Sequence, residues 1–363
     1  MFSAQDSVYM AQALRLAERG LYTTSPNPRV GCVLVADEKI VGSGWHERAG
    51  EPHAEVLALR ESGMAARGAT AFVTLEPCSH HGRTPPCADA LIAAGVVRVV
   101  VAVQDPNPQV AGQGIAKLCA AGIQVECGLM EAAARELNIG FFARMERGTP
   151  WLRSKIAASL DGRTALANGV SQWITGDAAR LDVQYWRARS CAVLTGIDTV
   201  LADDARLNVR EIETARQPLR VVLDSQLRMP LTARMLSEKN VLIYAAVRDP
   251  EKIAALEKTG ASVSVLPDGN GKVDLPAVLR DLAQRGCNEV LVESGSTLNG
   301  ALLRAGLVDE LLLYLAPQFL GDAARGMAQL GELTKLDQRI VLKWQDVRQI
   351  GNDLRIMVKV EHV

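Results

Sequence analysis

Apolar residues recur along the first part of the chain with two different spacings. Over 6–20 they return every three to four residues, which predicts a helix that begins near Asp6. Short apolar runs are typical of strands, and we expect strands at 30–35, 40–45, 71–75, 96–103 and 124–128. Further helical patterns cover 53–61, 87–94 and 115–121. Strands that alternate with helices predict an α/β layered domain.

A second alternation begins at Trp151, after a polar and charged stretch at 144–150 that we interpret as a linker. Expected strands are 152–158, 191–195, 219–224, 241–246, 263–266, 289–293 and 310–315, and expected helices are 177–188, 250–259, 275–285 and 298–305. The segment 349–360 alternates in part and predicts a final strand. We therefore expect two domains, 1–147 and 148–363.

The composition lets both domains build a core, because 48% of the 363 residues are hydrophobic and 22% are charged. The formal net charge is −1. Lys plus Arg against Asp plus Glu gives 13 − 15 = −2 for residues 1–148 and 27 − 26 = +1 for the rest. Neither part has the basic excess of a protein that grips phosphates, and 4% aromatics disfavours stacking on single strands. We expect no nucleic-acid partner.

Nothing in the sequence predicts secretion or membrane insertion. The first 24 residues carry four charged side chains within a helical pattern, unlike a secretory signal, and no apolar run reaches membrane-spanning length. Seven cysteines in a chain of this length do not form a disulfide framework, so we expect a reducing, cytoplasmic setting and no membrane partner. Five cysteines lie in or beside apolar segments and are expected in the core: Cys32, Cys119, Cys127, Cys191 and Cys287.

One imidazole and two thiols are spaced as in a catalytic metal site. They belong to His53, Cys78 and Cys87, and the carboxylate of Glu55 follows the imidazole two residues later. Three protein ligands leave the fourth position of zinc open for water, which marks a catalytic centre, and zinc lowers the pKa of that water toward neutrality. We therefore predict one Zn²⁺ per chain, with Glu55 carrying protons to a leaving amine.

The pattern fits half of the signature of zinc nucleobase deaminases, H-x-E with P-C-x-x-C. Pro77 precedes Cys78 as that signature requires, but eight residues, 79–86, separate the two cysteines. His53 lies in the first turn of a predicted helix and Cys87 begins the next one, where the partial positive charge of a helix N-terminus favours thiolate. The alternative is a structural Cys₂His₂ site with His80 or His81 as fourth ligand, which leaves Glu55 without a role.

Three other polar residues could serve the same site. Asn27, in Ser25-Pro26-Asn27-Pro28, could orient a ring or a ribose, although turn chemistry explains this segment equally well. Arg83 could pair with a substrate phosphate, but a solvated loop arginine is the simpler interpretation. His46 could contact substrate or be an ordinary loop histidine.

Residues 1–147 resemble the deaminase domain of the bifunctional riboflavin-biosynthesis deaminase/reductase family. The matching stretches are SPNPRVGCVLV, HAEVLAL and EPCSHHGRTPPC, and the wide cysteine spacing is itself a feature of this family. The resemblance implies a cytidine-deaminase-like αβα layered fold and a 2,5-diamino-6-(5-phosphoribosylamino)pyrimidin-4-one substrate. It also implies zinc on His53, Cys78 and Cys87, with Glu55 protonating first the ring nitrogen and then the leaving amine.

The stretch 293–300 follows an apolar strand and precedes a predicted helix. Its small residues would let backbone N–H groups approach a phosphate at the helix N-terminus. It matches neither G-x-G-x-x-G nor a P-loop, and an ordinary capped turn would also explain it.

Residues 151–363 resemble the reductase domain of the same family, which has a dihydrofolate-reductase-like α/β fold. The matching stretches are KIAASLDGRTA, SQWITG, TVLADDARLNVR, RVVLDS and VESGSTLNGALL, with Ala205 where the family pattern has proline. The resemblance implies NADPH as cofactor. The implied reaction reduces the ribosyl side chain of 5-amino-6-(5-phosphoribosylamino)uracil to ribityl.

The resemblance also implies which side chains contact ligands in this domain. The cofactor contacts would be Ala157, Trp173, Thr199, Asp203, Ser225, Gly295, Ser296, Thr297, Leu298, Asn299, Gly300 and Ala301. The substrate contacts would be Ser171, Arg187, Leu207, Arg210 and Glu293, with the two arginines suited to the ribose phosphate. The alternatives are a core position for Trp173 and a solvated surface position for Asp203 or Arg210. Lys155 and Asp161 are further candidates for shaping the site.

We therefore expect an enzyme that deaminates and then reduces small phosphoribosylated pyrimidines, as a homo-oligomer, dimer or tetramer. Two other functions remain open at this point. A nucleic-acid-editing deaminase would have a basic face, which the near-neutral charge argues against. A zinc module that binds a partner would hold zinc tightly but release no ammonia.

Overall fold

The computed structural model describes residues 2–79, 86–108 and 110–361, which divide into two compact units, Met1–Thr149 and Pro150–Val363. The polar stretch expected as a linker is helical over its first four residues, because helix α6 (Ile139–Arg147) runs through them. None of the described helices is long and apolar enough to cross a membrane.

The first unit holds one five-stranded sheet. Its strands are β1 (Gly31–Ala36), β2 (Lys39–Trp45), β3 (Thr70–Val73), β4 (Arg98–Val101) and β5 (Gln124–Cys127), and its remaining helices are α1 (Ala4–Glu18), α2 (Ala54–Ser62), η1 (Gly63–Ala66), α3 (Cys87–Ala94), α4 (Gln113–Ala120) and α5 (Glu131–Leu137). The strand order is β2-β1-β3-β4-β5. Strand β1 runs antiparallel to both neighbours, whereas β3, β4 and β5 are parallel.

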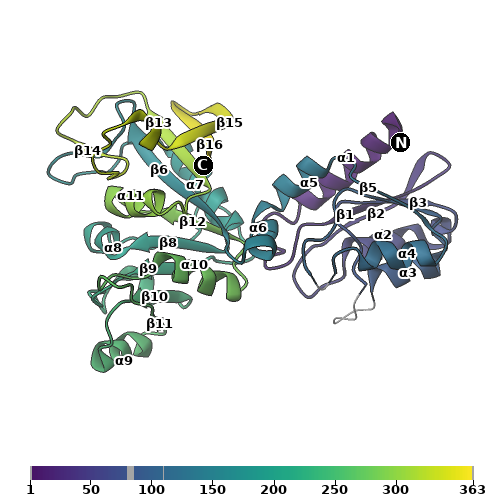
Figure 1. Ribbon diagram of the computed structural model, residues 1–363, viewed down its shortest axis with the longest axis horizontal. Coiled ribbons are helices and arrows are strands. Elements are labelled where there is room, and N and C mark those ends of the chain that lie inside the picture. Colours follow the sequence, from purple (N-terminus) through teal and green to yellow (C-terminus); the bar gives the residue numbers. More distant parts are fainter. Residues whose placement is uncertain (1, 80–85, 109, 362–363) are drawn as a thin grey trace. The chain divides into compact units, whose positions relative to one another are not determined.

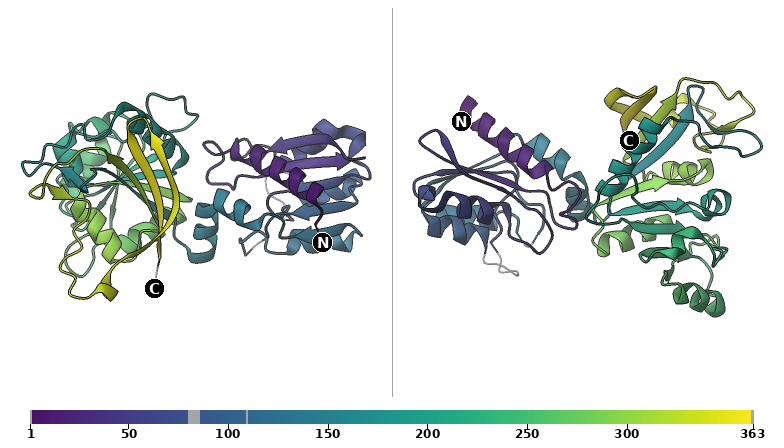
Figure 2. Two further views of the ribbon diagram at one scale, coloured as in Figure 1. Left: turned by 90° about the horizontal axis from the view of Figure 1, so that it is seen from above. Right: turned by 180° about the vertical axis from the view of Figure 1, so that it is seen from behind.

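Helices cover both faces of this sheet, as Figures 1 and 2 show. One apolar cluster joins Met10 of α1 and Phe141 of α6 to Phe72 on one face. The other joins Ala58 of α2 and Leu91 of α3 to the opposite face. The αβα layered fold expected for this domain is confirmed.

Local details of this unit differ from the expectation. Helix α1 begins earlier, because Ser3 is its N-cap and Asp6 closes the capping box from inside the first turn. Two helices, α5 and α6, were not expected, since their short apolar patterns follow one another without a strand between them. Cys119 and Cys127 are exposed rather than in the core, because each lies on the outward side of its element.

The second unit is built on a nine-stranded sheet. Its strands are β6 (Trp151–Ser159), β8 (Ala192–Gly196), β9 (Leu219–Leu223), β10 (Val241–Ala245), β11 (Ser262–Val265), β12 (Glu289–Glu293), β13 (Glu310–Ala316), β15 (Val341–Ile350) and β16 (Asp353–Glu361), while β7 (Arg163–Ala165) and β14 (Arg325–Gly326) form a separate pair. The order is β11-β10-β9-β8-β12-β6-β13-β16-β15, and the first seven strands are parallel. The predicted final strand is the second arm of an antiparallel hairpin, because a turn at Gly351 reverses the chain.

Two sets of helices cover opposite faces of this sheet. Helices α7 (Asp177–Arg189), α8 (Ile197–Asp203) and α9 (Pro250–Lys258) share one core cluster, and α10 (Leu275–Gln284) and α11 (Ser296–Arg304) share the other; η2 (Arg234–Ser237) and η3 (Leu336–Gln338) are short turns. Successive strands run outward from β6 to β11, and the chain then returns to place β12 between β8 and β6. Because crossovers are right-handed, this reversal puts the later helices on the other face.

A buried arginine links three neighbouring strands of this sheet. Arg153 of β6 donates from Nε to Glu310 of β13 at 2.7 Å and from Nη1 to Glu289 of β12 at 3.2 Å. All three side chains are at most 2% exposed, so each charge depends on its partners.

We predict that Arg153→Met lowers the free energy of unfolding of the second unit by about 3–5 kcal/mol, because it leaves the buried carboxylate of Glu310 without its cation and that of Glu289 with Arg189 alone. Urea unfolding followed by tryptophan fluorescence measures this change. The matched control is Arg234→Met, which breaks an exposed pair with Asp204 and is expected to cost under about 1 kcal/mol. Equal effects of the two substitutions would contradict the interpretation.

Candidate active sites

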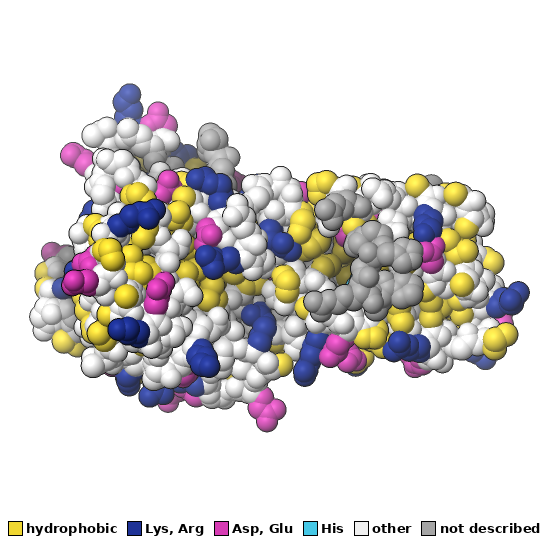
Figure 3. All heavy atoms as spheres, turned by 90° about the horizontal axis from the view of Figure 1, so that it is seen from below, with side chains coloured by type: hydrophobic (Ala, Val, Ile, Leu, Met, Phe, Trp, Pro, Cys, Tyr) yellow, Lys and Arg dark blue, Asp and Glu magenta, His cyan; other side chains and the backbone are white. Residues whose placement is uncertain are grey.

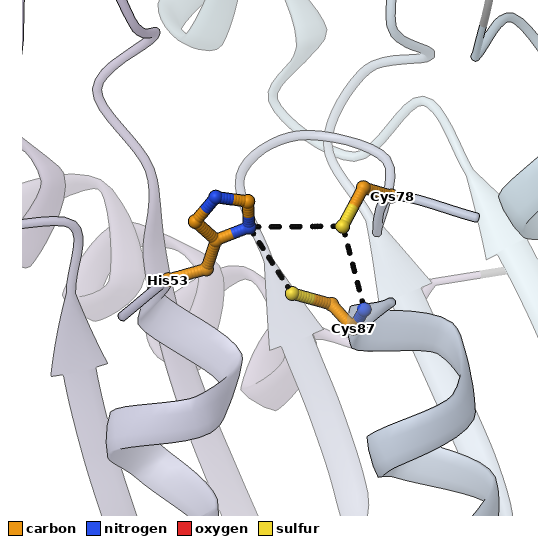
Figure 4. Close-up of side chains that lie close together, drawn as sticks. All are labelled: His53, Cys78 and Cys87. Carbon is orange, nitrogen blue, oxygen red and sulfur yellow. Dashed lines mark hydrogen bonds between the residues drawn. The ribbon is translucent and has the colours of Figure 1, made fainter. Parts of the chain in front are cut away.

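Three side chains that could bind a metal meet at one edge of the first sheet. His53 is the N-cap of α2, Cys87 is the first residue of α3, and Cys78 lies in the loop after β3. Figure 4 shows their donor atoms pointing at one another, with His53 Nδ1 3.2 Å from the Cys87 sulfur and 3.7 Å from the Cys78 sulfur. The structure thus brings together the three ligands expected from the sequence.

This donor set fits zinc. All three ligand atoms lie within 4.8 Å of one another. Bonds of about 2.3 Å to sulfur and about 2.0 Å to nitrogen at tetrahedral angles require donor separations of about 3.5–3.8 Å. Within the described part of the chain, no further His, Cys, Asp or Glu joins the group, so three ligands leave one position for solvent. His80, His81 and Arg83 lie outside the described residues.

The surroundings of Cys78 favour thiolate, whereas the hydrogen bond with Cys78 and burial raise the pKa of Cys87. The thiol of Cys87 and the imidazole of His53 lower the pKa of Cys78 to about 4, and the backbone N–H of Cys87 donates to the Cys78 sulfur at 3.3 Å. The pKa of His53 is raised, chiefly by its hydrogen bond with Cys78. The N–H is an unpaired donor of the first turn of α3, so the helix N-terminus itself stabilises one ligand.

Glu55 lies beside the metal ligands but is not one of them. Its side chain is 3% exposed, and burial raises the pKa of its carboxyl to about 7, although the nearby His53 imidazole opposes this rise. A carboxyl held near neutrality can both accept and donate a proton, as a general acid–base requires.

A second histidine, His46, packs against the ring of the metal ligand His53. The His46 ring lies edge-on to the His53 ring with centroids 5.2 Å apart, and its Nδ1–H donates to the carbonyl of Pro52 at 3.2 Å. Asn27 donates its amide to His46 Nε2 at 3.1 Å. Asn27 and His46 therefore belong to one partly buried network next to the metal ligands, and their hydrogen bond to each other could not be expected from the sequence.

In the second unit, the expected ligand contacts lie at the carboxyl edge of the parallel strands. Helix α8 follows β8 and covers one face, whereas α11 follows the adjacent strand β12 and covers the other. Ligands of open α/β sheets bind at such a point, where the helices of neighbouring strands diverge. Thr199 of α8 and Gly295 before α11 lie on its two sides, and Ser225 follows the next strand, β9.

A buried charge cluster occupies the centre of this edge. Arg187 of α7 holds Glu293 with a two-pronged pair, Nε to Oε1 at 2.6 Å and Nη2 to Oε2 at 2.9 Å. Lys155 of β6 lies 3.8 Å from the same carboxylate. Burial acts to raise the pKa of Glu293, but the Arg187 guanidinium outweighs it and lowers that pKa to about 2. Burial lowers the pKa of Lys155.

This pairing bears on the phosphate contacts expected from the sequence. The remaining guanidinium nitrogen of Arg187, Nη1, donates to the carbonyl of Asn208 at 3.0 Å, so all three nitrogens of this guanidinium form hydrogen bonds within the protein. The exposed Arg210 is held through its backbone N–H, which donates to Gln184 of α7 at 3.1 Å. Gln184 carried no signal in the sequence, because only the packing of α7 brings it to Arg210.

Trp173 is not a core residue, since its side chain is 66% exposed. The Arg180 guanidinium lies 4.5 Å from the centre of its ring and donates to the carbonyl of Thr175. Gln172, between Ser171 and Trp173, donates to Asp203 at 3.4 Å. The segment that carries Ser171 and Trp173 therefore lies beside the end of α8 on the outside of the unit.

Some side chains expected to contact ligand point into the protein instead. Leu207 is 3% exposed in the core beside α7, and Asn299 is 1% exposed. Asn299 accepts from Ser154 at 3.1 Å and donates to the carbonyl of Met327 at 3.2 Å. A Cβ on Gly300 would lie 2.1 Å from the Gln329 carbonyl, so this glycine serves close packing. Any ligand contact of these three residues stays a prediction.

The outer part of the same turn is open. Gly295 and Thr297 are exposed, and α11 has no side-chain cap on its first N–H groups. Ser296 and Thr297 line a cavity of about 280 Å³ together with the strand β14 and the residues after it. Free N–H groups and an open space fit the phosphates of a dinucleotide. Ala157 of β6 and Leu298 of α11 are half-buried. The hydroxyl of Ser225 accepts a hydrogen bond from the backbone N–H of Val273 at 3.2 Å.

Comparison with known proteins assigns both units. Residues 150–356 match the family model "RibD C-terminal domain", and residues 3–103 match "Cytidine and deoxycytidylate deaminase zinc-binding region". The riboflavin biosynthesis protein RibD of Escherichia coli K12 is 51% identical over 367 residues, covering 96% of this chain and 98% of that protein. RibD of Aquifex aeolicus is 41% identical, with 98% of each chain covered.

Solved structures agree over the full length. RibD of Acinetobacter baumannii superposes with a TM-score of 0.92 at 48% identity, covering 99% of each chain. A diaminohydroxyphosphoribosylaminopyrimidine deaminase/5-amino-6-(5-phosphoribosylamino)uracil reductase of Thermotoga maritima gives 0.86 at 32% identity, covering 98% of this chain and 99% of that one.

We predict that removing zinc destabilises the first unit, because the ligands come from three separate segments and the metal binds only the folded state. Binding at about 1,000 times the dissociation constant contributes about 4 kcal/mol. Calorimetry before and after chelation is expected to show the melting transition of the first unit falling by at least about 5 °C, with that of the second unit unchanged. His53→Ala is the control and should show no chelator effect. An unchanged transition after proven metal loss would refute the site.

Proposed function

The chain belongs to the RibD family of bifunctional riboflavin-biosynthesis proteins, and on that premise we propose which residues carry its two reactions. It is a zinc-dependent deaminase joined to an NADPH-dependent reductase. The observation that carries the assignment of roles is the metal group of His53, Cys78 and Cys87 with the buried Glu55 beside it.

The substrate of the first unit is the diaminopyrimidine that the Thermotoga maritima relative is named for. Zinc bound by His53, Cys78 and Cys87 supplies Lewis acidity that makes water a nucleophile near neutral pH. Glu55 would take one proton from the attacking water and give it to the ring nitrogen. It would then take the remaining proton of the new hydroxyl group and give it to the leaving amine. The ring carbon exchanges its C–N bond for C=O, and ammonia leaves.

The substrate of the second unit is 5-amino-6-(5-phosphoribosylamino)uracil, for which the same relative is named. NADPH supplies the reducing equivalents for the ring-opened sugar when bound, and the protein supplies alignment. Gly295, Ser296 and Thr297 would hold its phosphates through backbone N–H groups, with Thr199 of α8 and Ser225 after β9 following neighbouring strands. Their common place at the carboxyl edge supports this assignment.

The charge cluster of this unit binds the substrate. Arg210 is exposed, so its guanidinium is open to the ribose phosphate of the substrate. Arg187 holds the carboxylate of Glu293 in place for the polar groups of the substrate. Ser171 and Trp173 lie on the segment beside the end of α8 and would border the ligand site there. Lys155 completes the cluster next to Glu293.

The chain forms a homo-oligomer through the outer edge of the second sheet. Strand β15 is the last strand of that sheet and packs on α7. Both elements expose apolar side chains there: Leu181, Tyr185, Leu342, Trp344 and Val347, from 39% to 67% exposed. An exposed, apolar edge strand is a pairing surface, and a second copy would cover it. None of the seven cysteines forms a disulfide, which suits the reducing cytoplasm.

The face shown in Figure 3 gives no support to a nucleic-acid-editing role. On the face shown in Figure 3, the Lys and Arg side chains are interspersed with Asp and Glu. A phosphate-gripping protein gathers cations along one track instead.

We predict that Glu55→Gln lowers ammonia release from the phosphoribosylated diaminopyrimidine by at least about 10²-fold, because the amide cannot carry a proton. Zinc content by elemental analysis and NADPH oxidation with the deaminated product should match the wild type. Retained ammonia release in this variant would remove Glu55 from the mechanism. Absence of ammonia release by the zinc-loaded wild type would refute the function.

We predict that Trp344→Glu shifts the chain to a smaller species in light scattering coupled to size exclusion, since it places a charge in the apolar edge. Leu336→Glu is the control, because Leu336 is 83% exposed but lies on η3, outside the edge surface. The same species for wild type and Trp344→Glu would argue against this interface.

A further inference from the structure

Glu76 is a buried carboxylate that neither reaction uses. It lies between β3 and the zinc ligand Cys78, and its side chain is 4% exposed. Four backbone N–H groups donate to it: those of Gly114 and Ile115 to Oε1 at 2.9 and 3.1 Å, and those of Asp105 and Gly112 to Oε2 at 3.2 and 3.0 Å. No other ionised or polar side chain is needed to satisfy it.

Two of these donors belong to the first turn of α4. The N-cap of this helix is Gly112, which has no side chain to accept them. Glu76 therefore caps α4 from a distant segment, and its negative charge lies at the positive end of the helix. The position of α4 is thereby tied to the chain segment that carries Cys78.

The other two donors lie in the connection that joins β4 to α4. Asp105 is the fourth residue after β4 and Gly112 directly precedes α4, so one oxygen of the Glu76 carboxylate joins the two parts of this connection. The backbone N–H of Glu76 also donates to Val103 at 3.0 Å. Since β3 and β4 are parallel neighbours, the loop stands beside the metal ligands at the same sheet edge.

A steric contact reinforces the polar one. A Cβ on Gly114 would lie 1.9 Å from the carbonyl oxygen of Pro77, so the first turn of α4 rests directly on the residue between Glu76 and Cys78. No L side chain fits there without moving either backbone. Cys78 is thus held from one side by β3 and from the other by α4.

We propose that Glu76 is a positioning residue of the deaminase site, which sets the place of Cys78 by clamping α4 and the 105–112 loop against it. Glutamate suits this role because it accepts at both oxygens and donates nothing. Glutamine would face two of the four N–H groups with its own NH₂. This inference rests on the proposed deaminase function only for its effect on turnover.

The test replaces Glu76 by Gln in the full chain and measures metal binding as well as activity. We expect the zinc dissociation constant, from competition with a chromogenic chelator, to rise on the order of 10-fold, as for other residues that support metal ligands. The thiolate-to-metal absorption of the Co²⁺-substituted chain should shift, and kcat/KM for ammonia release should fall on the order of 10-fold or more. NADPH oxidation by the same chain should be unchanged.

Two further variants keep the test decisive. Gly114→Ala disturbs the same contact from the side of α4 and should shift the Co²⁺ spectrum in the same way, even if Glu76→Gln does not fold. Asp89→Asn is the control: it breaks the exposed ion pair of α3 with Lys117 of α4 and should leave spectrum and affinity unchanged. Unaltered Co²⁺ spectra and zinc affinity in both Glu76→Gln and Gly114→Ala would overturn the proposal while leaving the deaminase assignment intact. If the wild type released no ammonia, the deaminase assignment would fail, and the spectra alone would still decide the role of Glu76.

Discussion

The deaminase centre depends on the meeting of two helix N-termini at one edge of a sheet. His53 caps α2 and Cys87 begins α3, so the donor atoms of both come from the ends of helices where N–H groups are unpaired. One such N–H, that of Cys87, donates to the sulfur of Cys78. The Cys78 thiolate can be held this close to the other two donors because the helix ends supply positive potential to the site.

Each unit holds a carboxyl group of shifted pKa, and the two shifts have opposite directions. Glu55 is buried without a cation and its pKa is raised to about 7, whereas Glu293 in the other unit is buried on Arg187 and its pKa is lowered to about 2. Burial thus produces a carboxyl that can carry a proton in one unit, and the ion pair with Arg187 produces a permanent anion in the other. The difference lies in the partner, since a guanidinium outweighs the cost of desolvation and an apolar wall does not.

In both units the candidate site lies where parallel strands end, but a different structural feature forms the site in each unit. In the first unit, loops after β3 and β4 are fastened together by Glu76, a single acceptor for four N–H groups. In the second, the reversal of strand order separates α8 from α11 and leaves an opening between neighbouring strands. Ligand sites of open sheets form at such openings because backbone N–H groups of diverging helices point into them.

The amino-acid sequence alone was enough to predict the group of His53, Cys78 and Cys87, the two α/β units and nearly every strand. Ligand spacing and hydrophobic period are local properties, so they can be read without knowing the fold. Tertiary structure alone decided that the side chains of Cys119 and Cys127 are exposed and that those of Asn299 and Leu207 are buried. It also decided that Arg187 forms an ion pair with Glu293. It likewise decided that Glu76 caps a helix whose first-turn N–H groups lie 38 and 39 residues further along the chain. These outcomes depend on which faces and helix ends meet after packing, and a residue's sequence neighbours do not contain that information.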